Sequence, residues 1–147
     1  MEVRLVFDSC SENERFARMV IAAFVLDMDP TIEELADIKT AVSEAVTNCV
    51  IHGYPDTVGK IYMNCLKEEK TITVEIIDEG VGIEDIEKAM EPMYTTIPEE
   101  RSGMGFSFME AFMDEVQVES MPERKGTLVR MKKEIGKGRE LWTTQSI

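Results

Sequence analysis

The sequence predicts an α+β fold, a two-layer α/β sandwich in which helices cover one face of a mostly antiparallel mixed sheet. Two pairs of strand-like segments, 60–66 with 71–77 and 116–120 with 127–132, are each joined by a short polar turn. Such spacing favours antiparallel hairpins. Segments with helical periodicity lie before and between these hairpins, and they would cover the face that an antiparallel sheet turns to the core.

The first predicted elements are a short strand at residues 3–7 and a helix that follows it. Ser11 and Glu14 have the spacing of a capping box, in which two side chains bond backbone N–H groups at a helix start. Apolar residues that then recur at helical spacing predict the buried face of this helix. They are Phe16, Met19, Val20, Ala23 and Phe24.

A second helix has the clearest signals in the chain. Pro30 suits its first turn, and Thr31 with Glu34 forms another capping-box pair. Gly53 is predicted to end the helix. Its expected buried stripe consists of Leu35, Ile38, Val42, Ala45 and Cys49.

The rest of the chain predicts a short acidic helix near residues 84–90, a mobile loop over 92–102 and a helix over 103–112. The residues from 136 onward resemble a frayed tail. We expect a single domain over residues 1–135 and a flexible tail over 136–147, since 147 residues suit one domain.

Charge and composition exclude several classes of protein. The chain has 16 basic and 29 acidic residues, a formal charge of −13, and this argues against direct nucleic-acid binding. No apolar run approaches the roughly 20 residues that span a bilayer. The three cysteines are far apart in the sequence, which fits a reducing compartment and predicts a cytoplasmic protein without a membrane partner.

A polar row on the second helix is the first candidate for chemistry. Glu44, Asn48 and His52 are spaced four residues apart and therefore share one narrow helix face. An amide oxygen can bind Mg²⁺, and a carboxylate one turn earlier can accept a proton from a hydroxyl. Taken alone, the row is more typical of a hydrogen-bonded polar edge on an amphipathic helix.

A glycine-containing loop follows the strand at 71–77. Asp78 at the strand end could accept a hydrogen bond from an exocyclic amine, and Gly80 and Gly82 would let the backbone approach a flat ring. A tight turn would use the same residues. Thr127, which opens the last strand, could place a hydroxyl near a ligand, although a threonine at a strand start usually has a structural role.

A second glycine-rich run opens the helix predicted at 103–112. Free N–H groups and the partial positive charge at a helix start favour anions. A chain with a charge of −13 would need such local features to bind a polyphosphate. The alternative is a glycine-rich helix cap beside a solvated arginine. The run consists of Arg101, Ser102, Gly103, Met104, Gly105 and Phe106.

The order of these motifs resembles the ATP-binding domain of the GHKL superfamily, which gyrase B, Hsp90, histidine kinases and MutL share. The resemblance covers residues 31–132. The runs 13–18, 43–48, 51–54, 91–96 and 100–106 more narrowly resemble the anti-sigma F factors of spore-forming bacteria.

The resemblance implies a role for each matching residue. Glu44 would be the catalytic base, Asn48 would hold Mg²⁺ at the ATP phosphates, and Asp78 would bind the adenine amine. Gly80 and Gly82 would shape the pocket floor, with Thr127 at the adenine end. Residues 103–106 would cradle phosphates by their backbone, and Arg101 would contact the γ-phosphate. A lid would span residues 93–102 and end at the ATP-binding residue Ser102. Glu14 and Arg18 would lie on the partner-binding surface.

The resemblance further implies a homodimer that binds sigma F in the ATP state and distinguishes ATP from ADP. It would phosphorylate a serine of an anti-anti-sigma factor, with Mg²⁺ as cofactor. Two alternatives stay open. One is a related kinase that serves a stress-response sigma factor, and the other is a nucleotide-dependent sigma-binding module without kinase activity.

Overall fold

The computed structural model describes residues 1–83, 86, 90, 105–121 and 126–136. The strands are β1 (Glu2–Asp8), β2 (Lys60–Glu68), β3 (Thr71–Asp78), β4 (Glu115–Met121) and β5 (Gly126–Glu134). The helices are α1 (Glu12–Val25), α2 (Ile32–Asn48) and α4 (Gly105–Phe112), with a 3₁₀ turn at Leu26–Met28 and a π-helical turn at Cys49–Gly53. The loop predicted at 92–102 lies outside these residues, as do most of the helix predicted at 84–90 and nearly all of the tail.

The five described strands form one sheet in the order β1-β2-β3-β5-β4, and every pairing is antiparallel. The two predicted hairpins are present as β2–β3 and β4–β5. β5 lies between β3 and β4, and this pairing sets Thr127 opposite Asp78. The ends of β3 and β5 that carry two predicted site residues therefore adjoin.

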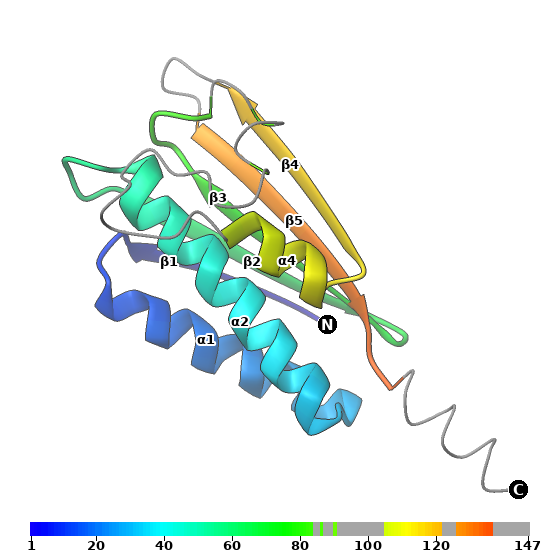
Figure 1. Ribbon diagram of the computed structural model, residues 1–147. Coiled ribbons are helices and arrows are strands. Elements are labelled where there is room, and N and C mark those ends of the chain that lie inside the picture. Colours follow the sequence, from blue (N-terminus) through cyan, green and yellow to red (C-terminus); the bar gives the residue numbers. More distant parts are fainter. Residues whose placement is uncertain (84–85, 87–89, 91–104, 122–125, 137–147) are drawn as a thin grey trace, which may run out of the picture.

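The three described helices cover one face of the sheet, with α2 between α1 and α4 (Figure 1). Alternate residues of the central strands point to this face and are fully buried against the helices. This arrangement confirms the predicted two-layer α+β sandwich. The largest fully buried side chains include Ile21, Ile38, Val42, Ile61, Met63, Ile72, Val74, Ile76, Met109 and Met131.

The face of α1 that packs on the protein differs from the predicted one. Phe16 and Met19 are 54% and 62% exposed, whereas Ala17 and Ile21 are fully buried. Apolar residues extend most of the way around this helix, so the sequence allows two overlapping stripes and tertiary packing selects between them. The other buried residues of α1 are Phe24 and Val25.

The capping box predicted at the start of α1 is also wrong. Ser11 has helical angles (φ −55°, ψ −35°) and its side chain makes no capping hydrogen bond. A capping side chain reaches the first turn from an extended backbone, so these angles remove its function. Glu14 instead accepts a hydrogen bond from Ser43 on α2 and thereby joins the two helices.

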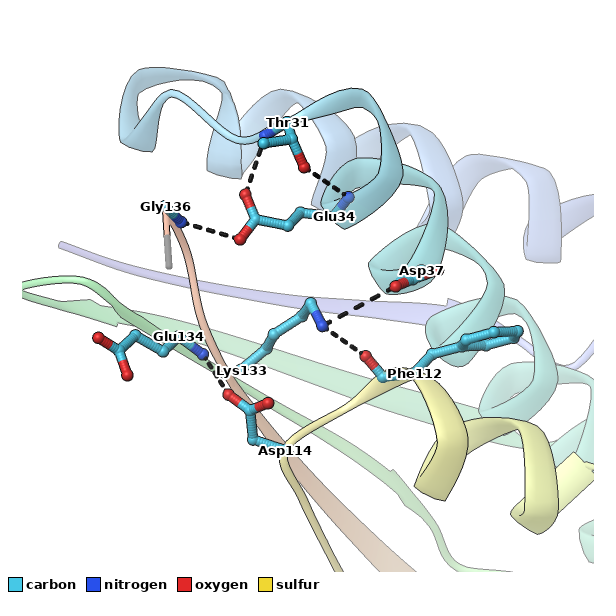
Figure 2. Close-up of polar contacts among 8 residues, drawn as sticks. All are labelled: Thr31, Glu34, Asp37, Phe112, Asp114, Lys133, Glu134 and Gly136. Carbon is cyan, nitrogen blue, oxygen red and sulfur yellow. Dashed lines mark hydrogen bonds and ion pairs between the residues drawn. The ribbon is translucent and has the colours of Figure 1, made fainter. Parts of the chain in front are cut away.

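The capping box predicted at the start of α2 is confirmed. The backbone N–H of Thr31 donates to Glu34 Oε1 at 2.9 Å, and that of Glu34 donates to Thr31 Oγ1 at 3.0 Å. The second carboxylate oxygen of Glu34 accepts a hydrogen bond from the backbone N–H of Gly136 at 2.9 Å (Figure 2). The first turn of α2 is therefore tied to the chain just beyond β5.

Candidate functional site

Helix α2 places Asn48 directly against the start of α4. A Cβ added to Gly105, the first residue of α4, would lie 3.0 Å from Asn48 Nδ2 and 3.1 Å from Oδ1. Only a residue without a side chain allows this approach without a shift of the amide. Glu44 lies one turn earlier on α2 and is half-buried. The helix that carries the predicted base and metal ligand therefore contacts the predicted phosphate-binding helix.

The end of α2 widens into a π-helical turn that the sequence did not reveal. The backbone N–H of Tyr54 donates to Cys49 O at 3.0 Å, which closes this wider turn. The carbonyl of Gly53 then accepts a hydrogen bond from Val81 N–H at 3.0 Å. A Cβ on Gly80 would come within 2.0 Å of the same carbonyl oxygen. The loop after β3 is thus packed tightly on the end of α2, and π-helical turns are frequent at functional sites.

Asp78 is one of two buried polar side chains in the described residues, with 3% of its surface exposed. Its Oδ1 accepts a hydrogen bond from Gly80 N–H at 2.9 Å. Burial raises the pKa of Asp78, and hydrogen bonds from the Gly80 backbone, the Cys49 thiol and the Thr127 backbone oppose this effect. The carboxyl is therefore held in place by donors while the protein interior disfavours its charge.

The buried thiol beside Asp78 is kept protonated. Burial is the main reason that the pKa of Cys49 is raised well above its ordinary value, and the neighbouring Asp78 carboxylate raises it further. A protonated thiol is a weak hydrogen-bond donor, so it complements an acceptor-only carboxylate. All three cysteines, Cys10, Cys49 and Cys65, are free thiols.

The adenine end predicted around Thr127 includes a serine that the sequence analysis missed. Ser120 Oγ on β4 lies 3.2 Å from Thr127 Oγ1 and accepts a hydrogen bond from Ile83 N–H at 2.5 Å. Gly126 precedes Thr127 with a φ of +79° and lies against the backbone carbonyl of Asp78. This hydroxyl pair therefore joins β4 and β5 to the loop that carries Gly80 and Gly82.

A tyrosine hydroxyl is a second residue that the sequence analysis missed. Tyr54 Oη donates to Lys60 O and accepts from Glu79 N–H, each at 2.7 Å. These two bonds connect the end of α2 with the start of β2 and with the loop after β3. Nothing in the local sequence signals this role, because the partners are 6 and 25 residues away along the chain.

The remaining predicted site residues are less fully described. Arg101, Ser102, Gly103 and Met104 lie outside the described residues, as does the predicted lid over 93–102. Phe106 is buried in the first turn of α4, and His52 is half-buried in the π-helical turn. The described part of the glycine-rich run, Gly105 and Phe106, lies where the sequence predicted a helix start.

The two predicted partner-binding residues form an ion pair on α1. Arg18 Nη1 lies 3.3 Å from Glu14 Oε1, and the same oxygen accepts the bond from Ser43 of α2. Glu14 is therefore mostly turned toward the protein, whereas the Arg18 side chain is 38% exposed. A partner that met this surface would contact the arginine more readily than the glutamate.

The described residues contain no cluster of three or more His, Cys, Asp or Glu side chains that could hold a metal ion. None of the described helices is both long enough and apolar enough to cross a membrane.

Solved structures show that the fold is shared. The RsbU and RsbW domains of a Mycobacterium tuberculosis protein align with a TM-score of 0.66 and 20% identity, covering 92% of this chain and 32% of theirs. The catalytic domain of histidine kinase ThkA aligns with a TM-score of 0.57 and 18% identity, covering 90% of this chain and 96% of that domain.

Sequence relatives identify the family. The histidine kinase-like ATPase domain family matches residues 8–133. The anti-sigma F factor of Thermoanaerobacter pseudethanolicus is 62% identical over 135 residues, which are 91% of this chain and 94% of the relative. The Bacillus subtilis anti-sigma F factor is 49% identical over 142 residues, 95% of this chain and 97% of the relative. The chain therefore belongs to the anti-sigma F factor family, which is built on the histidine kinase-like ATPase domain.

Proposed function

We propose that this chain is an anti-sigma factor and an ATP-dependent protein serine kinase. It would hold sigma F inactive in its ATP state and phosphorylate a serine of an anti-anti-sigma factor. Membership of an ATPase domain family supports the nucleotide, and the name of the relatives supports a sigma factor partner. The contact between Asn48 and Gly105 carries the proposal, because it unites the predicted metal ligand with the predicted phosphate-binding helix.

At the adenine end, Asp78 would accept a hydrogen bond from the exocyclic amine. Its carboxylate is already held by Gly80 N–H, so little side-chain freedom would be lost on binding. Gly80 and Gly82 would form the floor beneath the ring. Thr127, opposite Asp78 in the sheet register, would support the same end through its hydroxyl.

At the phosphate end, Asn48 would supply an amide oxygen to Mg²⁺. This ion takes oxygen ligands and is held in nucleotide sites by few protein groups beside waters and substrate phosphate oxygens, so an amide oxygen is compatible with it. When bound, Mg²⁺ would neutralise charge on the phosphates. The N–H groups at the start of α4, Gly105 and Phe106, would add hydrogen-bond donors, and Arg101 to Met104 are proposed to extend this cradle.

Glu44 would act as the base in phosphoryl transfer. The serine oxygen forms a bond to the γ-phosphorus while the bond from that phosphorus to the β,γ-bridging oxygen breaks. Glu44 takes the hydroxyl proton, phosphoserine forms, and ADP leaves. The protein contributes mainly position and charge stabilisation, since such a transfer needs little covalent work from the enzyme.

The sigma factor surface is proposed to include Arg18, with Glu14 holding the guanidinium in place. We also propose that the protein acts as a homodimer in the cytoplasm. The alternative is a related kinase that serves a stress-response sigma factor. A pull-down in which the ATP-loaded protein is offered a mixture of sigma factors distinguishes the two, because it identifies the sigma factor that the protein retains.

A transfer assay tests the proposed function. The purified protein, Mg²⁺ and γ-labelled ATP should label the cognate anti-anti-sigma protein, and a variant with alanine at the acceptor serine should stay unlabelled. Mg-ATP at a hundredfold excess over Kd should also raise the free energy of unfolding by about 2.7 kcal/mol. Stabilisation by Mg-ATP without phosphate transfer would indicate a binding module. The absence of both stabilisation and transfer would refute nucleotide binding.

The raised pKa of Asp78 predicts how ATP affinity depends on pH. Burial moves this pKa above 3.8, so the carboxyl gains its proton at a higher pH than an exposed aspartate does. A neutral carboxyl is a weaker acceptor for the adenine amine than a carboxylate. ATP affinity should therefore fall on acidification through the raised pKa.

Calorimetric titration over a pH series measures this effect, with Asp78→Asn as the control that cannot ionise. Between 3.8 and the raised pKa the native state binds more protons than the unfolded state. The contribution of Asp78 to the free energy of unfolding therefore decreases as pH rises through this interval. If ATP affinity depended on pH in the same way in the original protein and in Asp78→Asn, the assignment of Asp78 to the adenine amine would be contradicted.

A further inference from the structure

A lysine near the end of β5 joins three elements of the fold. Lys133 Nζ donates a hydrogen bond to Phe112 O, the carbonyl of the last residue of α4, at 2.7 Å. The same atom lies 3.9 Å from Asp37 Oδ2 on α2 (Figure 2). Only 13% of the Lys133 side chain is exposed, and its ammonium points between the two helices.

The physical chemistry of a helix end explains why a lysine suits this position. The last carbonyls of a helix lack partners within the helix and carry partial negative charge. The Lys133 ammonium donates a hydrogen bond to Phe112 O and places a positive charge beside its partial negative charge. The carboxylate of Asp37 balances the charge of the ammonium. Removing the ammonium would leave a carbonyl and a half-buried carboxylate without this partner.

The chain just after α4 is fixed to the same part of β5. Asp114 N–H donates to Lys132 O at 2.9 Å, and Asp114 Oδ2 accepts from Glu134 N–H at 2.7 Å. The partners of these bonds, Lys132 and Glu134, flank Lys133 in the sequence, and Figure 2 shows the bond between Asp114 and Glu134. The C-terminal end of α4 is therefore held to both the sheet and α2.

The other end of α4 begins at Gly105 against Asn48. The described part of this helix has eight residues, so Gly105 and Phe112 are only about 12 Å apart along its axis. A short rigid helix that is fixed at one end has little freedom at the other. We propose that Lys133 is a positioning residue that sets where the first turn of α4 meets the phosphates.

This inference rests on the proposed nucleotide site and deepens it. The adenine end is built from β3, β5 and the π-helical turn, where Asp78 and Thr127 adjoin. The hydrogen bond of Lys133 to Phe112 and its ion pair with Asp37 involve none of these adenine-end residues. Its loss should therefore weaken phosphate binding and leave adenine binding unchanged.

The test compares two probes on one variant. Lys133→Met keeps the length and apolar stem of the side chain but removes the ammonium. The quantity measured is the ratio of Kd for adenosine to Kd for Mg-ATP, at a temperature well below the melting transition. We expect this ratio to fall about tenfold, which corresponds to about 1.4 kcal/mol of lost phosphate binding. Lys133→Arg keeps the positive charge, so its ratio should be at least half that of the original protein.

Lys132→Met is the matched control. It makes the same change of charge one residue earlier on β5, and adjacent strand residues point to opposite sheet faces. It should leave the ratio within twofold of the original protein. If Lys133→Met does not fold, Lys133→Gln replaces it, and the ratio should again fall by at least threefold.

An unchanged ratio in a folded Lys133→Met or Lys133→Gln variant would overturn the inference and reduce Lys133 to a purely stabilising residue. A parallel loss of adenosine and Mg-ATP affinity would overturn it too, since the damage would then be general. If the original protein binds neither probe, the proposed nucleotide site itself fails, and the positioning role falls with it.

Discussion

Glu44→Ala is expected to lower phosphoryl transfer to the anti-anti-sigma protein about 10²–10⁴-fold, the usual contribution of a positioned general base. Nucleotide affinity should change little, because the proposed contacts to ATP come from Asn48, Asp78 and the start of α4. Single-turnover transfer of labelled phosphate measures the first quantity, and calorimetric titration with Mg-ATP measures the second.

Two variants serve as controls for the effect of Glu44→Ala. Glu44→Gln keeps the shape of the side chain but cannot take a proton, so it should lose transfer to a similar extent. Glu33→Ala removes an equal charge from an exposed position at the far end of α2 and should transfer at the normal rate. Normal transfer by Glu44→Ala would show that another group, or water, accepts the proton.

Gly126→Ala is expected to lower the free energy of unfolding by about 3 kcal/mol and to abolish ATP binding. The positive φ of +79° costs an alanine roughly 1–2 kcal/mol. Its Cβ would lie 1.8 Å from Asp78 O, and overpacking of this kind adds about 1–3 kcal/mol. Relief of the clash must move the backbone of Asp78, which would displace the carboxyl that is proposed to bind adenine.

Gly136→Ala separates the two costs. Gly136 has a similar φ of +87°, but an added Cβ would meet nothing within 4 Å. This variant should therefore lose only the conformational part, about 1–2 kcal/mol, and keep its ATP affinity. Chemical denaturation measures both variants. Equal losses at the two positions would mean that the approach of β5 to Asp78 is not tight.

Local signals predicted the elements whose stability is itself local. The capping box of Thr31 with Glu34 is confirmed, and so are both hairpins, because their defining contacts span only a few residues. The buried face of α1 was not predictable in the same way. Phe16 and Ala17 are neighbours in the sequence, and only packing against the sheet and α2 decides which one is buried.

In the candidate site, too, residues in local sequence patterns could be predicted, and residues whose role depends on tertiary contacts could not. Asp78 and Gly80 could be found from the sequence, since a carboxylate at a strand end followed by glycines is a local pattern. Tyr54 and Ser120 could not, because a lone hydroxyl carries no signal until the fold sets it beside Glu79 or Ile83. The π-helical turn was missed because glycine predicts where a helix ends and not how its last turn widens.

The carboxylate of Glu34 has a practical consequence for labelling the protein. Its two oxygens hold Thr31 and Gly136, so the chain leaves the described fold beside the first turn of α2. Asn48 is at the opposite end of this 17-residue helix, about 25 Å away. A fluorophore or affinity handle attached at Gly136 would therefore start remote from the proposed phosphate site at Asn48 and should leave ATP binding unobstructed.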